Sequence, residues 1–197
     1  MTQKIMEIVD YFHLDKTETS THLHNVKHLT KHFLSSIPNL SEPYKEAILN
    51  ASLLHDIGKA SIPTPILYKK GSLDETERLI VETHPLTGSY LFSKVLDKID
   101  YPQTPEESRV VKNVILYHHE RWDGTGYPHG LKGEEIPLES RIIMIVDVYD
   151  ALTSKRSYKP AWTKEETLRY IKAESGTMFD PHLVSLFTQL IQEEMNQ

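Results

Sequence analysis

The segment His55-Asp56-Ile57-Gly58-Lys59 places an imidazole beside a carboxylate at the end of an apolar run. One neutral nitrogen of His55 and one oxygen of Asp56 could bind a metal ion, while the second Asp56 oxygen reaches a neighbouring ion. Gly58 would let the backbone leave a helix there, which would bring the charge of Lys59 over the ions. In the alternative interpretation, His55 caps a helix and Asp56 forms an ion pair with Lys59. The choice between a metal site and simple capping depends on the residues in the rest of the chain.

A second group of candidate ligands lies on a helix predicted from residue 18 to residue 36. Its inward stripe has spacings of four, four, three and four residues, and consists of Glu18, His22, Val26, Leu29 and Phe33. A stripe whose second half is apolar must pack inward, so Glu18 and His22 would enter the interior together. A bound cation would offset the cost of burying them.

Another histidine series on the same helix has a similar spacing but a different direction. His24, His28 and His32 follow one another at intervals of four residues. Because each helical residue turns the chain by about 100°, this stripe lies near the face opposite to His22. We expect these three histidines to face solvent.

Further imidazoles stand at predicted helix ends. His84 comes directly before Pro85, a residue suited to the first turn of a helix. His118 and His119 follow the apolar residues of a helix around 110–116 and could converge on one ion if the backbone turns between them. The loop after them, residues 121–133, contains four glycines, which permit tight backbone close to a ligand. It lacks the lysine and hydroxyl that a Walker-type phosphate loop requires.

A nearly all-apolar helix over 139–153 carries Asp147 and Asp150 three residues apart, so both carboxylates share one face. No basic residue lies within a turn of Asp147, and a metal ion is the simplest partner for it. Lys155, Arg156 and Lys159 follow this helix. They are either an ordinary basic surface cluster or a set of contacts for an anionic substrate.

Together these arguments give eight candidate ligands, which exceed what one ion can use: Glu18, His22, His55, Asp56, His84, His118, His119 and Asp147. Two or three divalent ions bridged by Asp56 would use them all. Such clusters activate water and stabilise charge in the hydrolysis of phosphate esters. Mixed imidazole and carboxylate ligands favour iron or manganese, with zinc as a further candidate, over magnesium or calcium.

The remaining elements and the composition describe a helical carrier for this site. Further helices are expected over 42–57, 73–83, 163–172 and 181–194, and residues 62–66 should be extended or a short turn. A chain of 197 residues with 39% hydrophobic and 25% charged residues can bury a sizeable core, and we expect one domain.

The composition also excludes several classes of function. The absence of cysteine excludes disulfides, thiolate nucleophiles and sulfur-ligated metals. We expect a cytoplasmic location without membrane contact, because neither a signal peptide nor a membrane span is evident. The net charge of −6 argues against binding to a nucleic-acid polymer, although a local cationic pocket could still bind a small anion.

The order of these motifs resembles the HD-GYP subgroup of the HD-domain metal-dependent phosphohydrolases. The matching motifs are Glu18-Thr-x-x-His22, His55-Asp56-Ile-Gly-Lys59, Thr83-His84-Pro85, His118-His119-Glu-Arg-x-Asp-Gly-x-Gly-Tyr-Pro128 and Asp147-Val-x-Asp150-Ala-Leu-Thr. The resemblance implies an all-α fold, a single HD-domain-like helical bundle with a metal cluster at its centre. Its layout would be an N-terminal packing helix (1–17), a motif-bearing core (18–160) and closing helices (161–197).

The resemblance also implies an activity, the hydrolysis of cyclic di-GMP to linear pGpG and in some members onward to GMP. Glu18 would belong to members with a third ion, and the other seven ligands would hold the pair. Family residues that match Lys59, Asp150, Arg156 and Lys159 contact the substrate or orient groups that do. We hypothesise attack by a hydroxide bridging the two ions, with Asp56 and Lys59 as catalytic residues.

Rival interpretations remain open at this level. The chain could be a receptor that binds a cyclic dinucleotide without cleaving it, although a receptor could dispense with the eight ligands. It could also hydrolyse a mixed cyclic GMP-AMP or a nucleotide monophosphate. The Gly126-Tyr127-Pro128 loop is expected to form a wall of the pocket and is a candidate docking surface for a protein partner.

Overall fold

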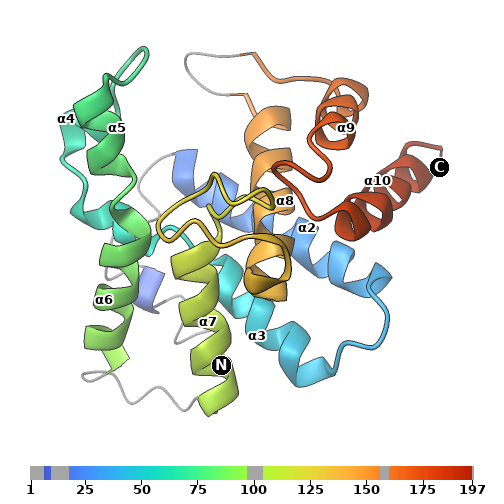
Figure 1. Ribbon diagram of the computed structural model, residues 1–197, viewed down its shortest axis with the longest axis horizontal. Helices are drawn as coiled ribbons and strands as arrows, with labels where there is room; N and C mark the ends of the chain where they lie inside the picture. Colours follow the sequence, from blue (N-terminus) through green and yellow to red (C-terminus); the bar gives the residue numbers. More distant parts are fainter. Residues whose placement is uncertain (1–6, 10–17, 97–103, 156–159, 197) are drawn as a thin grey trace.

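The computed structural model describes residues 7–9, 18–96, 104–155 and 160–196, and only the backbone of residues 18–20 and 96. Within these ranges the chain is helical and contains no strand, so the predicted all-α fold is confirmed (Figure 1). The elements are α2 (Glu18–Ser36), α3 (Glu42–Ser52), η1 (Ile57–Ser61), α4 (Thr64–Leu67), α5 (Glu75–Val81), α6 (His84–Leu96), α7 (Pro105–Tyr117), η2 (Gly133–Glu135), α8 (Leu138–Thr153), α9 (Lys164–Ala173) and α10 (Pro181–Met195).

Helix α8 is the central element, in contact with α2, α7, α9 and α10 (Figure 1). Ile142, Ile143, Ile145 and Val146 are fully buried on it. A helix that is apolar on nearly all sides must be surrounded by other elements, as the sequence predicted for this segment. The two carboxylates near its C-terminal end are therefore carried into the middle of the molecule.

Helix α2 has the predicted bounds and the predicted inward face. Val26 and Phe33 are fully buried, whereas His24 and His28 are exposed as expected. His32 is only partly exposed, and its Nδ1 lies 2.5 Å from Oε1 of Glu194 on α10. The second histidine series is therefore a surface stripe in which His32 pairs with Glu194.

The prediction that α3 continues to Ile57 was wrong, because α3 ends at Ser52. The N–H of Leu53 folds back to the carbonyls of Asn50 and Ala51. The carbonyl of Ser52 then accepts a hydrogen bond of 2.8 Å from Nδ1 of His55, so a side chain replaces the next helical N–H. His55 and Asp56 consequently lie in a turn between α3 and η1.

The expected role of Gly58 also needs correction, since Gly58 lies inside η1 and not at the end of α3. A Cβ atom at this position would stand 1.9 Å from the carbonyl oxygen of His84 and 2.7 Å from the backbone nitrogen of Gly88. Glycine is required because η1 and α6 approach backbone to backbone. This contact sets the position of Asp56 relative to His84.

The other predicted elements agree with the structure to within a few residues. Residues 64–67 form a single helical turn, α5 begins with a capping box at Asp74, and α9 and α10 match the two closing helices. Most of the expected N-terminal packing helix (1–17) lies outside the described residues. No helix in the described ranges has both the length and the hydropathy needed to span a bilayer.

Candidate metal centre

The structure brings together seven of the eight predicted ligands, and they come from five separate parts of the fold. His22 lies on α2, Asp147 lies on α8, and the others stand at element ends: His55 and Asp56 before η1, His84 at the start of α6, His118 and His119 after α7. The side chain of Glu18 lies outside the described residues, and so do Arg156 and Lys159. Their predicted roles stay predictions.

One group of ligand atoms surrounds Oδ1 of Asp56. The Nε2 atoms of His84 and His118 lie 3.3 Å and 3.7 Å from this oxygen and 3.4 Å from each other. His119 belongs to the same group, whose ligand atoms all lie within 4.8 Å of one another. This side of Asp56 therefore offers three imidazoles and one carboxylate oxygen.

A second group surrounds the other oxygen of Asp56. Nε2 of His55 lies 3.3 Å from Oδ2 of Asp56, and His22 completes a group with these two residues. Oδ1 of Asp147 adds a further carboxylate, 3.3 Å from Nε2 of His22 and 3.9 Å from Nε2 of His55. Asp56 thus belongs to both groups and turns one oxygen toward each.

The backbone fixes the tautomers of three of these histidines. Nδ1 of His55, His84 and His118 lies 2.8 Å, 2.8 Å and 2.9 Å from the carbonyl oxygens of Ser52, Val81 and Val114, respectively. A carbonyl oxygen can only accept, so each Nδ1 carries the proton and each Nε2 presents a lone pair to the cluster. Metal-binding histidines are commonly oriented in this way.

Two buried atoms at the centre have no hydrogen-bond partner among the described residues: Nε2 of His55 and Oδ1 of Asp56. Buried polar atoms are normally satisfied, so these two unpaired atoms, one in each group of ligand atoms, indicate missing partners. Ligands at about 2.1 Å from a tetrahedral ion lie roughly 3.4 Å apart. Several of the spacings here are close to that value, so the residues present fit divalent metal ions.

The protonation states on the Asp56 Oδ1 side also suit metal binding. Burial lowers the pKa of His84 to about 4 and lowers the pKa of His119 well below its usual range. Burial opposes ionisation of Asp56, but the charge of Lys59 and the contacts with His55 and His118 together outweigh it and hold the pKa of this carboxyl well below its ordinary value. Near neutral pH His84 and His119 are therefore neutral imidazoles beside an ionised carboxylate.

The His22 side is more strongly charged. Burial alone would lower the pKa of His22, but hydrogen bonds to Asp147 and Asp150 outweigh this effect and raise its pKa to about 9. Burial likewise opposes ionisation of Asp147, but the His22 hydrogen bond together with the charges of His55 and His22 outweighs it and holds the pKa of Asp147 below its usual range. A cation bound between these groups would take the place of a proton.

The contacts of the alternative interpretation of the His55-Asp56 pair are present, and they leave room for the metal interpretation. His55 uses Nδ1 to cap α3, and Oδ2 of Asp56 accepts a hydrogen bond of 2.5 Å from Nζ of Lys59. Nε2 of His55 and Oδ1 of Asp56 stay directed at the cluster, and Oδ2 of Asp56, although paired with Lys59, also lies 3.3 Å from Nε2 of His55. Capping and the ion pair therefore position the proposed ligands and do not compete with them.

Asp150 lies behind His22, and its side chain is almost fully buried. Its Oδ2 lies 2.6 Å from Nδ1 of His22, while Oδ1 accepts hydrogen bonds of 2.9 Å from Asn25 and from Ser154. In this geometry Asp150 orients a candidate ligand. The sequence interpretation did not include Asn25 or Ser154. The only available signal was that Asn25 lies three residues after His22 on the same helix.

The glycine-rich loop forms one wall of the cluster. Tyr127 stacks on His119 with ring centroids 4.8 Å apart, and its backbone N–H donates to the carbonyl of His119. Gly126 is tightly enclosed, since a Cβ there would lie 2.3 Å from the backbone nitrogen of Arg121. The buried carboxylate of Glu120 accepts hydrogen bonds of 2.7 Å and 3.0 Å from the backbone N–H groups of His129 and Leu131.

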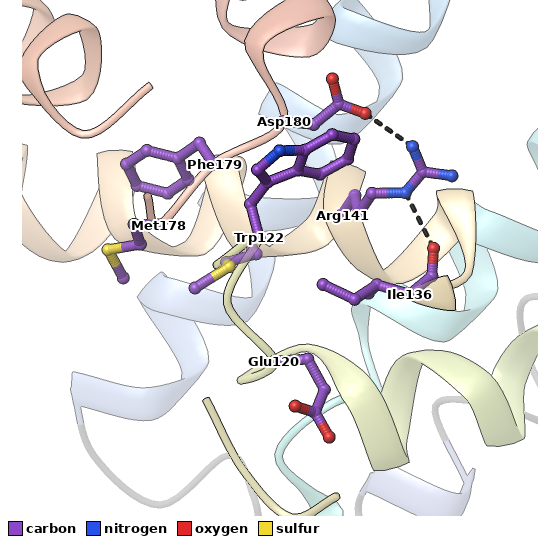
Figure 2. Close-up of a pocket in the computed structure, with 8 residues that line it drawn as sticks. Glu120, Trp122, Ile136, Arg141, Met178, Phe179 and Asp180 are labelled. Carbon is purple, nitrogen blue, oxygen red and sulfur yellow. Dashed lines mark hydrogen bonds and ion pairs between the residues drawn. The ribbon is translucent and has the colours of Figure 1, made fainter. Parts of the chain in front are cut away.

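Beyond the glycine-rich loop, residues of the loop, of α8 and of the segment before α10 line a small pocket (Figure 2). Figure 2 shows Arg141 beneath Trp122 and paired with Asp180. Nη1 of Arg141 lies 2.6 Å from Oδ2 of Asp180, and its Nε donates to the carbonyl of Ile136. These contacts anchor the outer part of the loop, and they include none of the candidate ligands.

Replacing Glu120 with glutamine should loosen this loop. A glutamine side chain has one acceptor oxygen, so its NH₂ group would face one of the two backbone donors, and that donor would lose its partner. We expect a loss of about 1–3 kcal/mol in the free energy of unfolding, measured by urea denaturation. Unchanged stability would contradict the clamping role of Glu120.

Comparisons with known proteins show which family this chain resembles. A family model described as the HD domain matches residues 16–183. The chain is 39% identical over 172 residues to a 3′3′-cGAMP-specific phosphodiesterase of Vibrio cholerae, a match that covers 87% of this chain and 31% of the relative. It is 41% identical over 166 residues to a cyclic di-GMP phosphodiesterase response regulator of Xanthomonas campestris, with 84% and 42% covered.

A solved structure is also similar to this chain. The crystal structure of a cyclic GMP-AMP-specific phosphodiesterase from V. cholerae matches with a TM-score of 0.61 and 25% identity, over 87% of this chain and 44% of the other. The chain thus spans less than half the length of these relatives. With its family match and its motifs, this chain belongs to the HD domain family, in the HD-GYP subgroup.

Proposed function

We propose that this chain is a metal-dependent phosphodiesterase that hydrolyses a cyclic dinucleotide, with cyclic di-GMP as the first candidate and pGpG, then GMP, as products. The observation that carries the proposal is the position of Asp56, which turns Oδ2 toward His55 and Oδ1 toward His84 and His118. A carboxylate shared in this way suits two adjacent ions. The names of the relatives from V. cholerae and X. campestris support the substrate class.

The proposed ligands divide into two sets that share Asp56. His84, His118 and His119 would hold one ion with Asp56, and His22, His55 and Asp147 would hold the other. Glu18 would serve a third. Nitrogen and oxygen ligands favour iron or manganese, with zinc as the next candidate. When bound, such ions supply an activated water and neutralise the charge that develops on phosphate.

The chain's own residues would bind and orient the substrate. Lys59 is partly exposed and paired with Asp56, so its ammonium group stands at the cluster as a fixed positive charge for a phosphate oxygen. Arg156 and Lys159, which follow α8, are the proposed further contacts, since Arg156 could grip a phosphate or a guanine edge with two hydrogen bonds. Tyr127 covers His119 and would help to exclude water from that side.

Mixed cyclic GMP-AMP is the second candidate substrate, because two of the proteins that this chain resembles are named for it. A receptor without activity is less favoured. Binding alone does not need seven potential ligands that converge on one buried space. The Gly126-Tyr127-Pro128 loop also stays a proposed docking site for a protein partner, since the neighbouring Thr125, His129 and Gly130 are exposed.

The test is turnover by protein loaded anaerobically with Fe²⁺ or Mn²⁺. Cyclic di-GMP and 3′3′-cGAMP are supplied separately and then in competition, and the linear products are separated by chromatography. We expect a linear dinucleotide from at least one substrate, and none from protein treated with a chelator. Tight binding of both substrates without cleavage in the loaded protein would favour the receptor interpretation and contradict the proposal.

A further inference from the structure

A short chain of polar contacts behind His22 links α2 to α8. Nδ1 of His22 lies 2.6 Å from Oδ2 of Asp150, and Nε2 of the same ring faces Asp147 at 3.3 Å. The Asp150 contact therefore determines which nitrogen of His22 is turned to the cluster. Anything that fixes the Asp150 carboxylate also fixes His22.

Asn25 is the residue that fixes this carboxylate from the His22 side. Its Nδ2 donates a hydrogen bond of 2.9 Å to Oδ1 of Asp150, which also accepts from Oγ of Ser154. With both donors on Oδ1, the carboxylate cannot rotate without leaving a buried acceptor unpaired, and Oδ2 remains directed at His22. Ser154 lies at the end of α8 itself, so among the described residues Asn25 is the donor that carries this restraint on Oδ1 across to α2.

The position of His22 makes such a restraint necessary. His22 is the fifth residue of α2, close to the N-terminal end of the helix, where backbone hydrogen bonds are incomplete. Leu23 and Val26 bury the helix against the core. The polar contacts of the His22 ring are those to Asp150 and Asp147.

We propose that Asn25 is a positioning residue for the metal centre: through Asp150 it holds the His22 ring with Nε2 toward the space shared with His55, Asp56 and Asp147. The inference rests on the proposed metal binding but not on the identity of the substrate. Removing the Asn25 amide should weaken binding of the ion on the His22 side. The ion among His84, His118 and His119 should be affected much less.

The experiment titrates metal-free protein with Mn²⁺ and follows free Mn²⁺ by electron paramagnetic resonance. The test variant is Asn25→Asp, which keeps the shape but sets a carboxylate against Asp150. The matched control is Asn113→Asp, because Asn113 donates a hydrogen bond of 2.8 Å to a buried carboxylate, Glu139, in the first turn of α8. Asn25→Ala serves as a second test variant that introduces no charge. Thermal unfolding of each metal-free variant is measured in parallel.

We expect Asn25→Asp to weaken one Mn²⁺ site by about 10–100-fold and to leave the other within about threefold of wild type, as is typical when a group behind a ligand is lost. Asn25→Ala should weaken the same site by about 10-fold. Asn113→Asp should lower the unfolding temperature and leave both sites unchanged. Wild-type affinity in both Asn25 variants, equal weakening in Asn113→Asp, or no Mn²⁺ binding by the wild type would each overturn the proposal. If the wild type binds Mn²⁺ but cleaves no cyclic dinucleotide, the proposed function fails and the role of Asn25 stands.

Discussion

Replacing Asp56 with asparagine is expected to lower turnover of a cyclic dinucleotide by about 10³-fold. This is the upper end of the loss in rate when one electrostatic group is removed from an active site. Asp56 is the only described residue that belongs to both groups of candidate ligands. Asparagine keeps the shape but offers one neutral oxygen, and its NH₂ group would face one of the two groups. We expect the bound metal to fall together with activity, as measured by elemental analysis after dialysis.

The control for this variant is Asp74→Asn. Asp74 is exposed and caps α5, and asparagine caps helices about as well as aspartate. Asp74→Asn should therefore keep full activity and full metal content. Wild-type turnover by Asp56→Asn would show that the shared carboxylate is dispensable and would contradict the proposed centre.

Replacing Gly58 with alanine is expected to cause the largest loss of stability. The added Cβ would lie 1.9 Å from the carbonyl oxygen of His84, and backbone atoms on both sides prevent the small shift that a flexible side chain would allow. Overpacking of this kind costs about 3 kcal/mol. For a chain of this size the unfolding temperature should fall by roughly 6–12 °C, measured by calorimetry.

The strain from Gly58→Ala should also reach the metal centre, because η1 and α6 carry Asp56 and His84 at their ends. We expect weaker metal binding even at temperatures where the variant is folded. Ala60→Ser is the control, since it adds one atom at an exposed position of the same short helix. If Gly58→Ala is as stable as Ala60→Ser, then η1 and α6 do not pack as closely as described.

The sequence predicted the helices well where one face is consistently apolar. α2 has the predicted bounds because the residues from His22 to Phe33 keep a helical period and are bounded by the turn before α3. The end of α3 was misplaced by five residues because Leu53, Leu54 and Ile57 are all buried, and an apolar run looks the same whether it is helix or buried turn. The hydrogen bond from the His55 side chain to the carbonyl of Ser52 ends the helix, and such a side-chain contact leaves no periodic pattern in the sequence.

The candidate ligands could be predicted because acidic and imidazole residues on inward faces or at helix ends have few other purposes. The supporting contacts could not. Asp150 could equally have faced a substrate, and its orienting role depends on Asn25 and Ser154, which reach it only in the folded chain. The need for glycine at position 58 likewise comes from α6, more than 25 positions later in the chain, and not from the local turn.

The most direct test of the centre is a crystal structure of protein purified without oxygen and loaded with Mn²⁺ or Fe²⁺, with anomalous scattering recorded at the metal edge. The account predicts two strong peaks about 3.5–4 Å apart on opposite sides of the Asp56 carboxylate, one beside His84, His118 and His119 and the other beside His22, His55 and Asp147. A third peak near Glu18 is compatible with this arrangement. A single peak that does not touch Asp56, or no peak within the cluster, would contradict it.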